Sequence, residues 1–195
     1  MPAAKDLVLA VISDTHVGDR MHDLPIELLE HLTELNPDVI LHAGDVSCRR
    51  ILDQLAEIAP VHAVQGNRDW MMGHKLPNSL QFTFNGMQLT LAHGHINILQ
   101  YLFDFLVYFF KGYTLTHTRY QENLGRLFPK ADIIIYGHTH YQMDEIMGGQ
   151  HFFNPGAVFP DHHNQHNPQY SILRISITGD VTGDVTGELR SIHQR

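Results

Sequence analysis

Residues 131–140, ADIIIYGHTH, begin as a hydrophobic run typical of a buried β-strand and end in two histidines separated by one threonine. Side chains two residues apart on an extended chain point to the same side, so the rings of His138 and His140 should leave the strand end together. Such a pair is typical of a metal site, but a chain with 16 histidines also produces pairs by chance. The elements around this stretch decide between the two interpretations.

Before this stretch, strand patterns and helix patterns alternate along the chain. Short apolar runs predict buried strands, and leucines at helical spacing predict amphipathic helices between them. The strands are expected at residues 7–13, 38–45 and 61–67, and the helices at 24–35 and 51–58. Repeated strand–helix–strand order predicts a parallel sheet with helices packed on it.

Later in the chain the pattern changes to antiparallel strands. Residues 79–94 contain two β-rich runs around Asn85-Gly86, which is the strongest short signal for a hairpin. Further alternating runs near the C-terminus predict more antiparallel strands, and the repeat TGDVTGDVTGEL at 178–189 predicts turns between short strands. We find no linker rich in Pro, Gly or Ser, so residues 1–195 are expected to form one α/β domain.

Each of the buried strands is followed by polar side chains that suit a binding site. In an open α/β sheet the carboxyl ends of the strands line a common crevice, and ligands bind there. Residues that are far apart in sequence are therefore expected to converge. These candidate ligands are Asp14, His16, Asp45, Asn67, His93, His138 and His140.

The chemistry of these seven side chains points to divalent metal ions. Carboxylate, amide and imidazole groups without a thiolate suit Mn²⁺, Fe²⁺, Ni²⁺ or Zn²⁺ rather than an iron–sulfur cluster. Seven ligands are too many for one tetrahedral ion, but they fit two ions that share the carboxylate of Asp45. Two such ions, with Mn²⁺ the first choice, would lower the pKa of a bridging water, and the resulting hydroxide would attack a phosphoester.

The motifs together resemble those of the calcineurin-like metallophosphoesterases. They are SDTH at 13–16, AGD at 43–45, GNRD at 66–69, AHGH at 92–95 and YGHTH at 136–140. With NPG at 154–156, the sequence is similar in particular to the small bacterial and archaeal phosphodiesterases of this superfamily. The resemblance implies a four-layer αββα sandwich, in which two mixed β-sheets are flanked by helices.

The resemblance also divides the ligands between two ions. It implies that one ion is held by Asp14, His16, Asp45 and His140. It implies that the other is held by Asp45, Asn67, His93 and His138. Asp45 and Asn67 are thereby catalytic residues as well as ligands.

One position departs from the family pattern. Arg68 stands where the family has histidine or cysteine. In members with histidine at this position, the resemblance implies that the histidine donates a proton to the leaving group. Arginine cannot give up a proton near neutral pH, but it can bind a phosphoryl oxygen. We expect Arg68 to bind the substrate and Asp69 to orient Arg68 or a histidine behind the ligands. His95 is expected to contact the substrate or a ligand.

A hydrophobic segment at about residues 96–128 makes the span between the last two histidine motifs longer than the resemblance implies. It includes INILQYLFDFLVYFF at 96–110. This run is interrupted by Asp104 and is shorter than the roughly 20 apolar residues that cross a bilayer. We expect a helical insertion that covers the crevice or forms a homodimer contact.

Composition excludes several classes of protein. A net charge of −8 argues against broad binding to nucleic acid. A single cysteine, Cys48, excludes an internal disulfide framework and fits a reducing compartment. The N-terminal sequence lacks the pattern of a signal peptide. The chain is therefore expected to be cytoplasmic and to have no transmembrane segment.

Two other groups of histidines receive structural interpretations. His42 lies three residues before Asp45, so it is expected on the opposite face of the strand from that aspartate. The loop PDHHNQHNPQ at 160–169 is rich in Asn, Gln and Pro and is expected to be solvated surface.

The leading functional hypothesis is a dinuclear-metal phosphodiesterase that acts on a small phosphodiester. A phosphomonoesterase with the same site is the first alternative. The second is a non-catalytic scaffold that binds proteins, because the scaffold subunit of retromer resembles this fold but has an impaired metal site. The present sequence retains all seven ligands.

Overall fold

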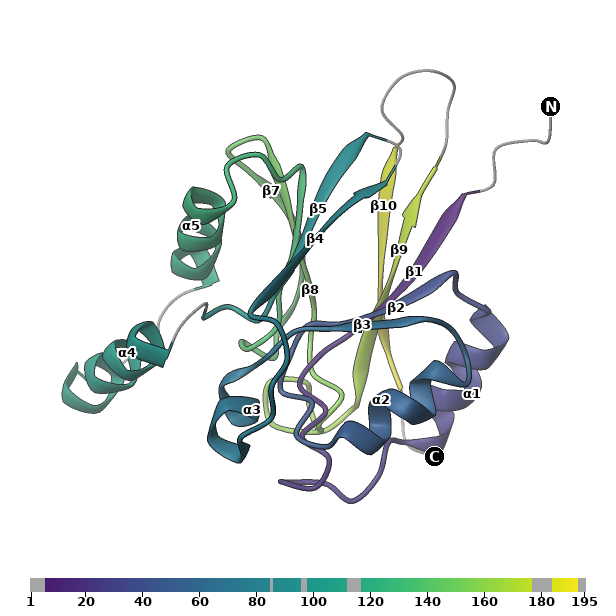
Figure 1. Ribbon diagram of the computed structural model, residues 1–195, viewed down its shortest axis with the longest axis horizontal. Helices are drawn as coiled ribbons and strands as arrows, with labels where there is room; N and C mark the ends of the chain where they lie inside the picture. Colours follow the sequence, from purple (N-terminus) through teal and green to yellow (C-terminus); the bar gives the residue numbers. More distant parts are fainter. Residues whose placement is uncertain (1–5, 85, 96–97, 112–116, 177–183, 193–195) are drawn as a thin grey trace.

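The computed structural model describes residues 6–84, 86–95, 98–111, 117–176 and 184–192. Its strands are β1 (Leu7–Ile12), β2 (Val39–His42), β3 (Val61–Ala63), β4 (Ser79–Phe84), β5 (Met87–Ala92), β6 (Ile133–Ile135), β7 (Gln142–Met147), β8 (Gln150–Pro155), β9 (Gln169–Ile175) and β10 (Val185–Ser191). Its helices are α1 (Ile26–Leu35), α2 (Arg49–Ala56), α3 (Asn67–Met72), α4 (Ile98–Lys111) and α5 (His117–Leu127). The strands form two five-stranded sheets, in the order β10-β9-β1-β2-β3 and β4-β5-β6-β8-β7 (Figure 1).

The first sheet combines parallel and antiparallel strands. β1, β2 and β3 are parallel, as the alternation of strands and helices predicts, and β9 and β10 extend the sheet antiparallel from β1. β2 ends earlier than expected, at His42, because the chain turns to positive φ at Gly44 and Asp45. The repeat at 178–189 falls partly outside the described residues, and its last unit belongs to β10, an antiparallel strand as expected, which pairs with β9.

The second sheet is also mixed. The predicted hairpin is present as the antiparallel pair β4 and β5, although Asn85 itself lies outside the described residues. β6 pairs in parallel with both β5 and β8, and β7 and β8 form a second antiparallel pair. The central position of β6 explains its uninterrupted isoleucines, because a strand with neighbours on both edges and layers on both faces is wholly buried.

Three apolar layers hold four layers of secondary structure together. Leu28 of α1 and Ile51 of α2 pack on the outer face of the first sheet. Leu41 and Ile135 belong to the core between the two sheets, and Leu124 of α5 packs on the outer face of the second sheet. The architecture is therefore the αββα sandwich that the family resemblance implies (Figure 1).

The segment expected at about 96–128 forms two helices, α4 and α5, and residues 112–116 between them lie outside the described part. α5 buries Tyr120 and Leu124 and supplies the outer helical layer of the second sheet, so it belongs to the fold itself. α4 stands away from both sheets (Figure 1). None of the described helices has the length and apolar character needed to cross a bilayer.

Candidate metal centre

The seven candidate ligands meet at one edge of the sandwich, where the loops after several strands come together. Asp14 and His16 follow β1, Asp45 follows β2, and Asn67 begins α3. His93 follows β5, and His138 and His140 follow β6. All seven side chains are buried or largely buried. The structure therefore brings the predicted ligands together, and the distances among them show two overlapping groups.

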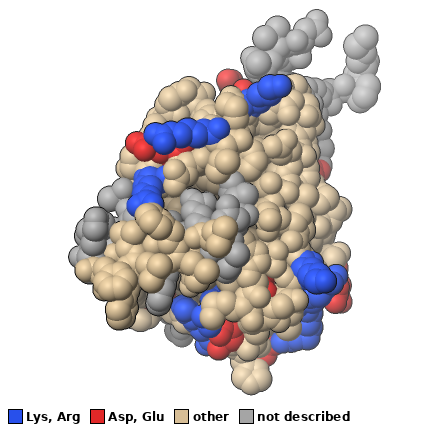
Figure 2. All heavy atoms as spheres, turned by 60° about the vertical axis from the view of Figure 1, so that its left-hand side comes forward, with Lys and Arg blue, Asp and Glu red and all other residues tan. Residues whose placement is uncertain are grey.

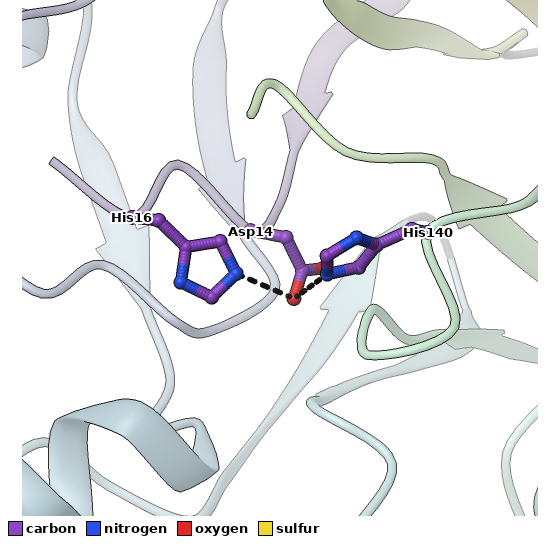
Figure 3. Close-up of side chains that lie close together, drawn as sticks. All are labelled: Asp14, His16 and His140. Carbon is purple, nitrogen blue, oxygen red and sulfur yellow. Dashed lines mark ion pairs between the residues drawn. The ribbon is translucent and has the colours of Figure 1, made fainter. Parts of the chain in front are cut away.

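The first group consists of Asp14, His16 and His140, whose ligand atoms lie within 4.8 Å of one another. Asp14 Oδ1 is 3.2 Å from His140 Nε2 and 3.9 Å from His16 Nε2 (Figure 3). Oδ2 of the same carboxylate accepts hydrogen bonds from the Ser13 hydroxyl and the His138 backbone N–H, at 2.6 and 3.0 Å. These two bonds fix the carboxylate so that Oδ1 faces the histidines.

The second group consists of Asp14, Asp45 and His93, also within 4.8 Å of one another. His93 Nε2 lies 3.5 Å from Asp45 Oδ1 and 3.1 Å from Asn67 Oδ1. Asn67 Oδ1 is in turn 3.0 Å from His138 Nδ1. The four ligands that the resemblance assigns to one ion thus form a chain of contacts, from Asp45 through His93 and Asn67 to His138, with Asp14 at their border.

Asp45 belongs to the second group and also reaches His16 of the first. Its Oδ1 faces His93, and its Oδ2 is 3.7 Å from His16 Nε2. Burial raises the pKa of Asp45 to about 7, and the Asp14 carboxylate adds to this effect although His93 opposes it. A buried carboxylate that is costly to ionise has a strong affinity for cations, and this one can present one oxygen to each group.

The residues present fit a divalent cation. Within the described ranges, both ring nitrogens of His16 are buried and have no hydrogen-bond partner. Buried polar atoms are nearly always paired, and exceptions call for an explanation such as a bound ion. Oxygen and nitrogen ligands without sulfur match the preferences of Mn²⁺, Fe²⁺, Ni²⁺ and Zn²⁺.

Two of the histidines are held from behind in a way that directs Nε2 to the centre. His93 Nδ1 is 2.7 Å from the Ala43 carbonyl oxygen, to which it donates. His140 Nδ1 is 2.5 Å from Asp161 Oδ2. A hydrogen bond from the outer ring nitrogen to a carbonyl or carboxylate is the usual support of a metal-binding histidine, since it fixes the tautomer and the ring orientation.

The contact with Asp161 corrects the expectation that the loop 160–169 is only solvated surface. Asp161 Oδ1 accepts the backbone N–H of His163 and Asn164, which closes the loop around the carboxylate. Asn154, which is fully buried, donates to the Gly137 carbonyl and the Thr139 hydroxyl and so holds the loop of the last two histidines. The sequence signal for Asp161 was an acidic residue beside histidines, which solvated loops also contain.

The backbone at the centre adopts an uncommon conformation. Five of the seven candidate ligands have left-handed φ angles, between 50° and 71°. They are Asp14, His16, Asp45, His138 and His140. Non-glycine residues at positive φ are uncommon and collect at functional sites, and Asp and His tolerate the region better than most. Gly44 cannot be replaced in the same way, because a Cβ there would lie 2.6 Å from Nδ1 of the His93 ring.

Three residues were predicted to assist catalysis, and each has partners of a different kind: Arg68, Asp69 and His95. The Arg68 guanidinium donates to both oxygens of Asp19, at 2.8 and 2.6 Å, while its backbone N–H donates to Asp45 Oδ1. Asp69 does not orient Arg68 or a histidine. Its carboxylate is fully buried and accepts three backbone N–H groups, from Val46, Ser47 and Gly66, because these otherwise unpaired donors surround it.

His95 lies behind a ligand. Its ring packs edge-on against His138, with centroids 4.3 Å apart, and against Tyr101 and Tyr120. Burial lowers the pKa of His95 to about 3, so the ring is neutral in this environment. His42 is likewise buried, with Nε2 3.1 Å from the Thr15 hydroxyl and Nδ1 accepting from the Gly44 N–H.

Ion binding should release protons from this centre. Burial disfavours a charged ring at His140, but the carboxylates of Asp14 and Asp161 outweigh it and raise the pKa of His140 to about 10. The ring is therefore protonated at neutral pH in the ion-free protein, and it must lose a proton to become a ligand. Affinity for Mn²⁺ should accordingly rise as the pH increases from about 6 to about 8.

Calorimetric titration of the chelator-treated protein in buffers with different heats of ionisation measures this release. In Asp161→Asn one of the two carboxylates that stabilise the protonated ring is lost, so the variant should release up to about one proton fewer. Asp53→Asn, at an exposed position on α2, is the control and should match the wild type. Equal proton release by all three proteins would contradict the role given to Asp161.

Comparisons with known proteins agree with this geometry. Residues 7–178 match the family model of the calcineurin-like phosphoesterase superfamily domain. A protein of Methanothermobacter thermautotrophicus named "Probable metallophosphoesterase" is 31% identical over 169 residues, which cover 87% of this chain and 86% of the relative.

Solved structures share the architecture at lower identity. Vacuolar protein sorting 29 from Cryptosporidium parvum has a TM-score of 0.68 at 18% identity, covering 95% of this chain and 98% of its own. Wild-type Vps29 from Entamoeba histolytica, complexed with Zn²⁺, has a TM-score of 0.65 at 21% identity and covers 95% and 99%. At these identities the two structures show a common fold and leave activity open.

Proposed function

The chain belongs to the calcineurin-like phosphoesterase superfamily, and on that premise we propose that it is a metal-dependent phosphodiesterase that hydrolyses a small phosphodiester in the cytoplasm. The observation that carries the proposal is the buried cluster of two carboxylates, an amide and four imidazoles, in which both ring nitrogens of His16 have no hydrogen-bond partner among the described residues. A merely structural cluster would have paired these atoms.

Two divalent ions would bind, one at each of the two ligand sets that the family resemblance implies. Asp14, His16, Asp45 and His140 would hold one, and Asp45, Asn67, His93 and His138 the other. Mn²⁺ is the first choice; Fe²⁺, Ni²⁺ and Zn²⁺ accept the same ligands, and a Zn²⁺ complex of a protein with this fold supports an ion of this kind. When bound, such ions lower the pKa of coordinated water and neutralise charge on phosphoryl oxygens.

The protein's own part is to fix the ligands and to position the substrate. Asp69 holds the loop after Asp45 through its backbone N–H groups, and the Arg68 N–H orients the Asp45 carboxylate. The Arg68 side chain is 26% exposed, and its Nη1 contacts Met71 Sδ at 3.9 Å. This nitrogen retains donor capacity for a phosphoryl oxygen while Asp19 holds the rest of the guanidinium.

The same arrangement limits the leaving group. Arg68 stays charged at any physiological pH and does not act as a general acid. Burial lowers the pKa of His95 and of His138, so neither ring is an imidazolium that could act as a general acid. Substrates whose leaving group departs as a stable anion are therefore favoured, and aryl phosphodiesters are the natural probes.

The test compares two aryl esters under several ions. The chelator-treated protein is reloaded with Mn²⁺, Fe²⁺, Ni²⁺ or Zn²⁺, and turnover of bis-p-nitrophenyl phosphate is compared with that of p-nitrophenyl phosphate. We expect kcat/KM to be higher for the diester. A clear preference for the monoester would identify a phosphomonoesterase instead, and binding of ions without turnover of either ester would indicate a scaffold of the same fold.

A further inference from the structure

Helix α4 carries an apolar surface that the described chain leaves uncovered. Six large side chains on it are between 47% and 78% exposed. They are Leu99, Leu102, Phe103, Leu106, Phe109 and Phe110. Their spacing of three and four residues places them along one side of the helix, here called the α4 face. Large contiguous apolar patches on a protein surface mark sites of interaction with other molecules.

The position of α4 leaves this face open to a partner. The helix projects from the sandwich (Figure 1), and the surface on this side is largely uncharged, with both basic and acidic side chains around its border (Figure 2). Another side of the helix turns to the metal centre, because the Tyr101 ring packs edge-on against His95 at 5.4 Å. The partner of the α4 face would therefore lie close to the crevice without entering it.

The length of α4 decides how it could meet a lipid bilayer. Fourteen residues of α-helix extend about 21 Å, less than the roughly 30 Å of a hydrocarbon core. The helix cannot cross, but one with Leu and Phe along one side can lie in the plane of the membrane surface with those side chains inserted.

The distribution of charge favours an anionic surface over a second copy of the chain. Residues 98–130 contain four basic and two acidic residues, Lys111, Arg119, Arg126, Lys130, Asp104 and Glu122. The segment therefore has a formal charge of +2 in a chain of −8, and the remainder carries −10. Two copies of a positive segment repel each other, whereas anionic lipids attract this segment and repel the rest, which orients the protein.

We propose that the α4 face docks on a membrane surface that contains anionic lipids. Docking goes beyond the proposed hydrolysis and does not require it, since none of the six side chains of the face is a ligand. Through Tyr101, His95 and His138, it places the metal centre beside the lipid headgroups.

Sedimentation of the full chain with vesicles tests the proposal, in the presence of a chelator so that divalent ions play no part. The chain should bind vesicles of phosphatidylcholine with phosphatidylglycerol at least about tenfold more tightly than vesicles of phosphatidylcholine alone. Phe109→Glu/Phe110→Glu, at positions 71% and 78% exposed, should weaken binding by about tenfold or more. Ile146→Glu, at an equally exposed apolar position on β7, is the matched control and should bind like the wild type.

Two results would overturn the proposal. One is wild-type protein that does not sediment with either vesicle. The other is a wild-type dimer that Phe109→Glu/Phe110→Glu converts to a monomer, shown by sedimentation velocity, without vesicle binding; the α4 face would then bind a second copy. Ester hydrolysis is assayed separately, so failure of the proposed activity and failure of docking are distinguishable.

Discussion

Asp45→Asn is expected to lower turnover of bis-p-nitrophenyl phosphate by about 10³-fold or more, since it removes the charge shared by both ligand groups. The amide keeps the shape of the side chain and can still accept the Arg68 N–H through Oδ1. Its nitrogen, however, replaces a carboxylate oxygen, so one of the two groups faces a donor where a cation needs an acceptor. Loss of activity should therefore accompany loss of ion binding, measured by calorimetry.

Stability distinguishes this effect from misfolding. Burial raises the pKa of Asp45 to about 7, above its value in the unfolded chain, so the ionised carboxylate opposes folding above that pH when no cation is bound. At about pH 8 in chelator, Asp45→Asn should thus unfold at a temperature no lower than the wild type. Asp53→Asn is the surface control. Activity of Asp45→Asn within tenfold of the wild type would contradict the shared role of Asp45.

Gly66→Ala is expected to lower the free energy of unfolding by about 3 kcal/mol or more and to lower activity with it. A Cβ at this position would lie 2.1 Å from Asp45 Oδ1 and 2.3 Å from the Asp45 backbone nitrogen. The φ of Gly66 is −98°, which alanine adopts readily, so the cost comes from the clash and not from the backbone. Relief would require the Asp45 loop to move away from His93 and His16.

Gly125→Ala is the matched control. A Cβ at Gly125 would lie 2.7 Å from Gln150 Oε1, the far end of a side chain whose Nε2 donates to the Phe128 and Ala131 carbonyls, so a small shift of this end relieves the contact. Alanine in the last turn of α5 also favours the helix over glycine, so this variant should remain within about 1 kcal/mol of the wild type. Urea unfolding followed by circular dichroism measures both. Equal stability of the two variants would contradict the tight contact at Gly66.

The strands along the chain and the candidate ligands that follow them were accessible from the sequence because they depend on local patterns. Buried strands such as β1 and β6 appear as apolar runs, and parallel strands deliver whatever follows them to the same edge. Asp14 and Asp45 follow neighbouring parallel strands of one sheet, so the sequence places them near each other. His138 follows β6 of the other sheet, so its position beside Asp14 depends on how the two sheets stack. The αββα layering came from the family resemblance, since local patterns do not specify how two sheets stack.

Contacts between distant loops were not accessible in the same way. Asp161 supports His140 and Asp19 pairs with Arg68 because tertiary packing brings these loops together, and no spacing in the sequence encodes either pair. The role of Asp69 was wrong for the same reason: its partners are backbone groups of a loop about twenty residues earlier, which side-chain chemistry does not reveal. α5 likewise belongs to the fold and not to an added segment.

The positive φ angles of five candidate ligands restrict how the metal preference of this protein could be re-engineered. Exchanging His16 or His140 for a β-branched residue, or for a longer acid such as glutamate, would place an unsuitable side chain on a left-handed backbone. Asp, Asn and His are the ligand-bearing residues that accept this geometry at low cost. A library aimed at a new ion should therefore permute these three at the five positions and seek further diversity at Asn67 and His93.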